Sequence, residues 1–137
     1  MSGNTTTHQV LRPRGWMRPR GYANGIAASG RQVFIAGQIG WDEHGSFRSD
    51  RLSDQVRQAL DNIVAVLAEA GGAPQHLVRL TWYITSRDEY LREIAEVGAA
   101  YRDVLGRHFP AMSVVQVAAL VETRAKVEIE ATAVIPG

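Results

Sequence analysis

The 137-residue chain has no cysteine, almost no net charge and no long apolar run. Without cysteine it has no disulfide bonds, no thiolate zinc ligands and no cysteine nucleophile. A formal net charge of +1 provides no overall field that would attract nucleic acid or a membrane surface. No window contains the eighteen or more apolar residues of a membrane span, and no continuous apolar stretch marks a secretory signal. We therefore expect a soluble, cytoplasmic protein.

Three kinds of site are also missing. Gly37 and Gly40 are not followed by the Gly-Lys-Ser/Thr sequence of a phosphate-binding loop. No serine nucleophile elbow is present. The histidines are scattered without the spacing of metal ligands, at His8, His44, His76 and His108. We therefore expect neither a metal nor a bound cofactor.

Residues 1–20 are predicted to form a flexible basic arm ahead of a single domain over residues 21–137. Proline resists regular structure, and the arm interleaves arginines with proline and glycine. Arginines beside a tryptophan are a weak signal for RNA contact, so a solvated or loosely docked arm is the simpler interpretation. The residues concerned are Arg12, Pro13, Arg14, Gly15, Trp16, Met17, Arg18, Pro19 and Arg20.

The body alternates in type, which predicts an α+β domain of order ββαβαββ with a mixed sheet. We expect strands over 21–28 and 32–39, a helix over 53–70, a strand over 77–85, a helix over 86–105, and strands over 113–120 and 125–135. The turn signal Ser29-Gly30-Arg31 predicts that the first two strands form an antiparallel hairpin. Ser53 and Ser86 are the expected caps of the two helices.

The last strand separates two kinds of side chain. Val127 and Ile129 point one way, whereas Glu128 and Glu130 point the other, because side chains alternate along a strand. Two helices suffice to cover one face of the sheet, so the other face is left half-polar, with charges in mid-strand. Such charges need partners. A second copy of the chain is the simplest partner, with sites formed at the seam.

Four motifs, in this order and spacing, resemble the reactive-intermediate deaminase family, also called Rid or YjgF. They are Ala36-Gly37-Gln38-Ile39, the run from Gln55 to Ile63, Phe109-Pro110-Ala111, and the run from Lys126 to Ala131. The resemblance covers about residues 21–135. It implies a chorismate-mutase-like fold with two helices on one face of the sheet. It also implies a homotrimer with the sheets inside and a small-molecule pocket between each pair of subunits.

Members of this family hydrolyse enamines and imines to ketones and ammonia without a metal or bound cofactor. The resemblance implies that Glu128 and Tyr22 help to place water, and that backbone groups at Gly37 contact the ligand. Tyr83 shares the polar sheet face with Glu128 and is counted with the ligand-facing residues, although a plain sheet residue is its simpler interpretation.

Three positions depart from the family pattern. Met112 stands where the family has the arginine that clamps the substrate carboxylate, Gly98 replaces an asparagine and Val114 replaces a cysteine. Hydrogen bonds to charged groups are worth about 1.5–3 kcal/mol each, and a thioether offers no donor. Losing the clamp implies about a hundredfold weaker affinity for a 2-imino acid. Arg20 and Arg124 are candidate replacements, with solvated arginines the simpler interpretation.

Three functions remain open at this point. The first is hydrolysis of an imine, enamine or related C–N bond outside the 2-imino acids, with Met112 shaping an apolar wall. The second is a non-catalytic trimer that binds a metabolite or a protein, in which Met112 fills space in a decayed site. The third is RNA cleavage, since some relatives carry ribonuclease names, but the near-neutral charge and the absence of paired catalytic histidines count against it.

Overall fold

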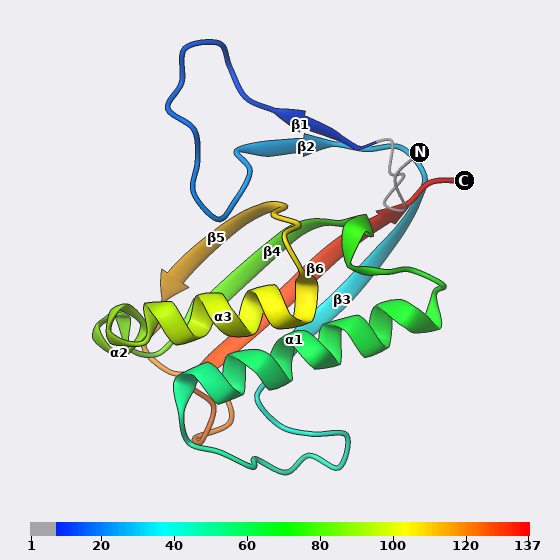
Figure 1. Ribbon diagram of the computed structural model, residues 1–137. Helices are drawn as coiled ribbons and strands as arrows, with labels where there is room; N and C mark the ends of the chain where they lie inside the picture. Colours follow the sequence, from blue (N-terminus) through cyan, green and yellow to red (C-terminus); the bar gives the residue numbers. More distant parts are fainter. Residues whose placement is uncertain (1–7) are drawn as a thin grey trace.

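A computed structural model describes residues 8–137 and contains two sheets (Figure 1). The small sheet is an antiparallel pair, β1 (Gln9–Leu11) and β2 (Gly25–Ala27). The main sheet has the strand order β3-β6-β4-β5, and it is mixed because β4 and β5 run parallel while the other pairs are antiparallel. Its strands are β3 (Arg31–Ile39), β4 (Leu77–Ile84), β5 (Ala111–Gln116) and β6 (Val127–Ile135).

Two long helices cover one face of the main sheet, so the predicted α+β fold is confirmed (Figure 1). The helical segments are α1 (Leu52–Glu69), the 3-10 turn η1 (Pro74–His76), α2 (Arg87–Arg92) and α3 (Ile94–Leu105). Helix α1 packs on β3, β6 and α3. Within residues 8–137, no helix combines the length and the apolar character needed to cross a membrane.

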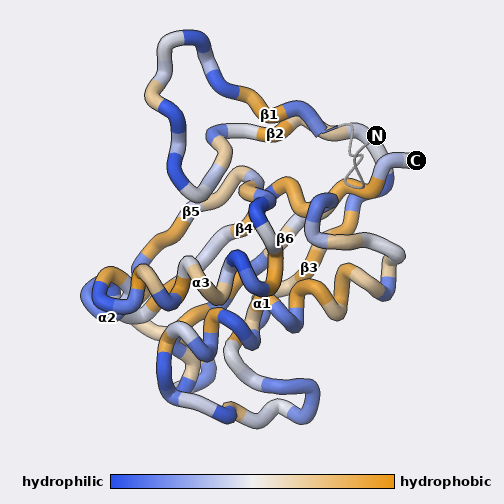
Figure 2. Tube along the Cα trace, viewed as in Figure 1, coloured by the Kyte–Doolittle hydropathy of each residue, from blue (hydrophilic) through white to orange (hydrophobic). Residues whose placement is uncertain are grey.

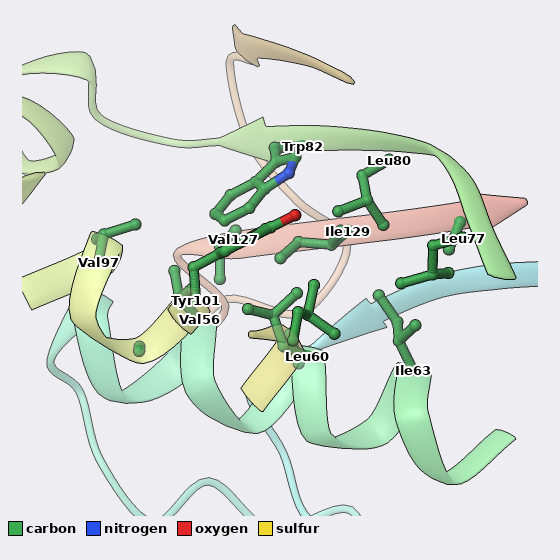
Figure 3. Close-up of a cluster of buried hydrophobic side chains, with 14 of the residues drawn as sticks. Val56, Leu60, Ile63, Leu77, Leu80, Trp82, Val97, Tyr101, Val127 and Ile129 are labelled. Carbon is green, nitrogen blue, oxygen red and sulfur yellow. The ribbon is translucent and has the colours of Figure 1, made fainter. Parts of the chain in front are cut away.

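The core lies between these helices and the sheet (Figure 3). Helix α1 buries a stripe at three- and four-residue spacing, as predicted from its periodicity: Leu52, Val56, Leu60, Ile63 and Leu67. Trp82 of β4, Tyr101 of α3 and Phe109 stack in a row, with ring centroids 6.3 and 5.4 Å apart. Apolar segments accordingly concentrate along the sheet and the inward helix faces, while the loops are largely hydrophilic (Figure 2).

The second predicted helix is interrupted at Glu93. Its helical spacing would place Leu91 and Ile94 on the inward face, but they are 54% and 47% exposed because they flank this break. At the break, the Glu93 carboxylate accepts hydrogen bonds from the Ser53 amide at 3.1 Å and from Arg51 Nε at 3.4 Å. Ser53 therefore is not the cap of α1, because a carboxylate from another helix satisfies its N-terminus. The Ser86 cap is confirmed, since its hydroxyl accepts from the Glu89 amide.

Burial tends to raise the pKa of Glu93, but hydrogen bonds from Ser53 and the charge of Arg51 outweigh burial. The pKa of this carboxyl consequently lies below its ordinary value. Glu93 is therefore ionised at neutral pH and complements the positive end of α1.

The predicted hairpin between the first two strands is wrong. β2 pairs with β1, while β3 pairs along its length with β6. The turn at Gly30 reverses the chain without joining the two strands, because a local turn signal does not decide which strand becomes the partner. The absence of regular structure expected in residues 1–20 is also wrong at Gln9–Leu11. Residues 1–7 of that arm lie outside the described residues.

Gln55 fastens the loop before β6 to helix α1. It is 1% exposed, and its amide nitrogen donates to the carbonyls of Ser49 and Arg124, while its oxygen accepts from the Lys126 amide at 2.8 Å. Gly40 permits this approach, because a Cβ there would lie 2.5 Å from the Gln55 Cβ. One side chain thus positions the start of the strand that carries Glu128.

Replacing Gln55 by alanine should lower the free energy of unfolding by about 3 kcal/mol, because three hydrogen bonds of roughly 1 kcal/mol each are lost. Gln58→Ala is the matched control. Gln58 is on the same helix and, among residues 8–137, its side chain bonds only Asn62 one turn on, so the change should cost about 0.5 kcal/mol or less. Urea unfolding at one protein concentration measures both. Equal losses would contradict this role for Gln55.

Candidate functional site

Glu128 and Gly37 lie together on the sheet face that the helices leave uncovered. Glu128 of β6 is paired with Tyr83 of β4 on one side and Ile39 of β3 on the other. The register of β3 shifts between Ile35 and Gln38, at the segment that contains Gly37. A Cβ at position 37 would overlap the Glu128 carboxylate oxygen Oε2. Gly37 therefore leaves the space that the carboxylate occupies.

Tyr83 is on the same face but is engaged with Glu130. Its phenol donates to Glu130 Oε1 at 2.8 Å. This hydrogen bond, with a smaller effect of burial, raises the pKa of Tyr83 above its ordinary value, so the phenol stays neutral at physiological pH. Across residues 8–137, no side chain or backbone group hydrogen-bonds to the Glu128 carboxylate. Its oxygens are thus available to water, ligand or another chain.

Tyr22, Met112 and Val114 form a second group around the start of β5. The Ala23 amide donates to the Pro110 carbonyl at 3.0 Å, and Ala23 bridges Ala111 in parallel, which places Tyr22 beside this strand. Tyr22 is 42% exposed. These contacts bring together the tyrosine and the Phe-Pro-Ala-Met segment, two features that are almost ninety residues apart in the sequence.

Met112 and Val114 point to the helix side of the sheet. They are paired in register with Leu80 and Trp82, which are buried in the core, and side chains paired across a sheet share a face. Met112 is half-buried and packs against the core cluster, whereas Val114 is 38% exposed. Met112 therefore adds apolar surface to the helix side of β5.

Gly98 lies on the helix side as well, half-buried in α3. A Cβ there would lie 3.2 Å from Arg102 Nη1, so the guanidinium folds back over the glycine. A larger side chain at position 98 has to displace this flexible group.

The candidate residues consequently fall into two groups on opposite faces of one sheet. Glu128, Gly37 and Tyr83 are on the uncovered face, whereas Met112 and Val114 are on the helix face, with Tyr22 beside β5. The backbone of the sheet separates the two groups within a single chain. One chain alone therefore does not bring Glu128 and Met112 into one pocket.

Of the two arginines considered as replacements for the missing charge, Arg124 is engaged elsewhere. Arg124 donates to Asp50 Oδ1 at 2.9 Å, and its guanidinium lies over the Phe47 ring at 5.2 Å from the centroid. Arg20 is exposed on the loop between β1 and β2.

A cavity of about 710 Å³ that the sequence did not predict lies beneath the β1–β2 hairpin, and Tyr22 is in its wall. Arg12 and Arg18 of the arm line it, together with Arg107 after α3. The arm, the segment before β2 and the segment after α3 meet there. In the sequence, only the run of arginines in the arm indicated a possible binding region.

Several known proteins are similar to this chain over most of its length. The family model described as endoribonuclease L-PSP matches residues 17–135. The 2-iminobutanoate/2-iminopropanoate deaminase of Salmonella typhimurium is 34% identical over 116 residues, 82% of this chain and 86% of that protein. A RutC family protein of Pyrococcus horikoshii is 34% identical over 82% of this chain and 85% of its own.

Solved structures have the same fold. A Yersinia pestis protein of the conserved Rid family is 33% identical, with a TM-score of 0.79 over 93% of this chain and 98% of that chain. TdcF of Escherichia coli, crystallised with bound serine, is 32% identical, with a TM-score of 0.66 over 88% of this chain and 91% of that chain.

Changing Gly37 to alanine should displace the Glu128 carboxylate at a cost of about 1 kcal/mol or less, because the group that has to move is the end of a flexible side chain without a hydrogen-bond partner in residues 8–137. Gly98→Ala is the matched control. It should stabilise α3 by up to about 1 kcal/mol, because alanine is the better helix former and Arg102 can move aside. Thermal unfolding compares the two. A loss of about 3 kcal/mol or more in Gly37→Ala would contradict this description, because it would mean that the Glu128 carboxylate cannot move aside.

Proposed function

The chain belongs to the endoribonuclease L-PSP family, which includes the Rid proteins, and we propose that it is a trimeric hydrolase acting on imines, enamines or related activated C–N bonds. The support for this reaction is the similarity to a relative named as a 2-iminobutanoate/2-iminopropanoate deaminase, together with the retained Tyr22 and Glu128. Its substrate differs from a simple 2-imino acid, because Met112 has no charge to hold the carboxylate.

The observation that carries the proposal is the division of the candidate residues between two faces. A pocket containing both groups requires a second chain, whose uncovered face lies against the β5 edge of the first. Both surfaces suit an interface. Phe34 is 73% exposed on the uncovered face, which is hollowed by a cavity of about 540 Å³, and Val115 is 44% exposed on the β5 edge. In a closed ring of three such head-to-tail contacts, every uncovered sheet face and every β5 edge is buried against a neighbouring subunit.

In this pocket, Tyr22 and Met112 come from one subunit, and Gly37 and Glu128 come from its neighbour. The Glu128 carboxylate accepts a proton from water as the water adds to the C=N carbon. The proton passes to the nitrogen, which gives a carbinolamine. Glu128 then takes the proton of the new hydroxyl and delivers it to the amino nitrogen as the C–N bond breaks, so that ketone and ammonia leave. Tyr22 orients the water or the ligand through its phenol, and backbone groups near Gly37 hold the ligand.

Met112 favours a ligand whose surface is apolar at this position. The thioether has neither charge nor donor, and it packs flexibly against varied shapes. Val114 extends the apolar wall along the same face of β5. A substrate that lacks a carboxylate beside its C–N bond fits this wall, as does one that carries its acid elsewhere.

A second candidate is a trimer that binds a metabolite without turnover. Met112 is the observation that favours it, because the chain lacks the charge with which relatives orient their substrate. The unbonded Glu128 carboxylate beside Gly37 favours the enzyme instead. Ammonia release separates the two functions, since a binding protein gives calorimetric heat with a ligand but no product.

Glu128→Gln and Tyr22→Phe should each lose most ammonia release over a panel of imines generated in solution, because each removes one group that places water. Mixing the two inactive variants as unfolded chains and refolding them together should restore about a quarter of the sites, since each pocket takes Tyr22 from one subunit and Glu128 from the next.

Light scattering on the wild type accompanies this experiment and should give three times the 15.0 kDa mass of the chain. Glu130→Gln is the control, because that carboxylate is on the same face but already bonds Tyr83. A stable monomer would sink the shared pocket. Unchanged rates in Glu128→Gln would sink the reaction but leave the assembly standing.

Met112→Arg should raise hydrolysis of 2-iminobutanoate by about a hundredfold in kcat/KM, because a guanidinium binds a carboxylate through two charge-assisted bonds. Met112→Leu has the same apolar character and should leave this rate unchanged. Coupled ammonia assays measure both variants after circular dichroism has shown that they fold. A folded Met112→Arg protein with no gain would show that position 112 does not border the reacting ligand.

A further inference from the structure

The cavity beneath the β1–β2 hairpin is basic. Its wall includes the guanidinium-bearing side chains of Arg12, Arg18 and Arg107, and no aspartate or glutamate lines it. The three arginines come from the end of β1, from the loop between β1 and β2, and from the segment after α3. They therefore converge only in the folded chain.

These charges are not neutralised by the described part of the protein. Within residues 8–137, none of the three arginines forms an ion pair, whereas Arg48, Arg51, Arg57 and Arg124 all do. Like charges that line one concave space repel one another and attract an anion. Burying one anionic group among them relieves the repulsion.

The rest of the wall suits a small organic molecule. Leu11, Pro19 and Phe109 supply apolar surface, and Tyr22 adds its phenol. A volume of about 710 Å³ is in the range of metabolite pockets, which are mostly apolar with a few polar groups that fix the ligand.

The histidines of the wall are held differently. His108 bonds the Leu77 carbonyl through Nε2, and His8 bonds the Val134 carbonyl in the same way. The Nδ1 atom of His8 is buried and has no hydrogen-bond partner in residues 8–137. A neutral ring that donates from Nε2 to a carbonyl has Nδ1 as an acceptor, so His8 shapes the wall and leaves the anion to the arginines.

We propose that this cavity binds the oxyanion of a small metabolite, a carboxylate or a phosphate, between Arg12, Arg18 and Arg107. Guanidinium groups match the geometry of both oxyanions through paired hydrogen bonds. The inference rests on the proposed function for the identity of the ligand, since Tyr22 is in the cavity wall and also belongs to the proposed reaction site. The acid that Met112 does not hold is then bound at the hairpin, and the substrate is long enough to span from the arginines to Tyr22.

Calorimetry tests the proposal with three probes at low salt: 2-oxobutanoate, phenyl phosphate and the uncharged 2-butanone. At least one of the two anions should bind, binding should weaken with added sodium chloride, and 2-butanone should bind at least tenfold more weakly. The tighter anion shows whether the cavity prefers a carboxylate or a phosphate. The site is overturned if neither anion binds at millimolar concentration, or if 2-butanone binds as well as they do.

Variants locate the binding. Arg107→Ala and Arg18→Ala should each weaken binding tenfold or more, and Arg107→Lys should recover part of the loss. Arg14→Ala is the matched control, because Arg14 is on the same arm but not in the cavity wall. The side chains of Arg14, Arg18 and Arg107 are all exposed, so the variants should fold, and circular dichroism checks this. Equal affinity in Arg14→Ala and Arg107→Ala would overturn the site.

The two proposals fail separately. Anion binding that depends on Arg107, without ammonia release from any imine, would sink the reaction and keep the anion site. Ammonia release that is unchanged in Arg107→Ala and Arg18→Ala, with no anion affinity, would sink the anion site and keep the reaction.

Discussion

Strand β6 pairs with β3 on one side and β4 on the other, and along its length apolar and polar side chains alternate. Val127, Ile129, Ala131 and Ala133 are buried against the helices. Glu128 and Glu130 are therefore forced onto the opposite face, since successive side chains of a strand point in opposite directions. The hydrophobic driving force that closes the core thus also sets the position of the proposed general base. The uncovered sheet face and the separation of the two candidate groups follow from this one alternation.

The helix side is held in register by a few long-range polar contacts. Gln55 connects α1 to the loop before β6, and Glu93 connects the α2–α3 junction to the start of α1. Both side chains form hydrogen bonds with backbone groups that have no backbone partner. A buried backbone group left without a hydrogen bond would destabilise the fold. Gly40 and Gly37 allow close packing in this region. Gly40 leaves space for the Gln55 side chain, and Gly37 leaves space for the Glu128 carboxylate. Gln55, Gly37 and Gly40, which lie in or beside the sequence motifs, therefore act mainly by positioning the strands of the main sheet.

Positive charge is distributed unevenly over the candidate regions of this chain. At Met112 the sheet offers an apolar wall, whereas Arg12, Arg18 and Arg107 face a common cavity at the hairpin. Tyr22 is adjacent to both places, because the segment before β2 runs beside β5 and also closes the cavity. If the proposed reaction and the proposed anion site are both correct, the ligand has an apolar part near the C–N bond and a charged end further away, and the hairpin contributes to specificity along with the sheet.

Periodicity was sufficient for the parts of the fold that are governed by local pattern. The stripe of α1, the alternation of β4 and β6, the Ser86 cap and the covering of one face by helices all follow from spacings of two, three and four residues. Sequence motifs identified candidate residues such as Glu128 and Met112. The alternation of apolar and polar side chains along the last strand predicted that Glu128 lies on the polar face. The pairing of β2 with β1, the break at Glu93 and the cavity of arginines did not follow from the sequence. Each depends on residues brought together from distant segments, and only packing in three dimensions decides which strand edge, carboxylate or guanidinium is near enough to interact.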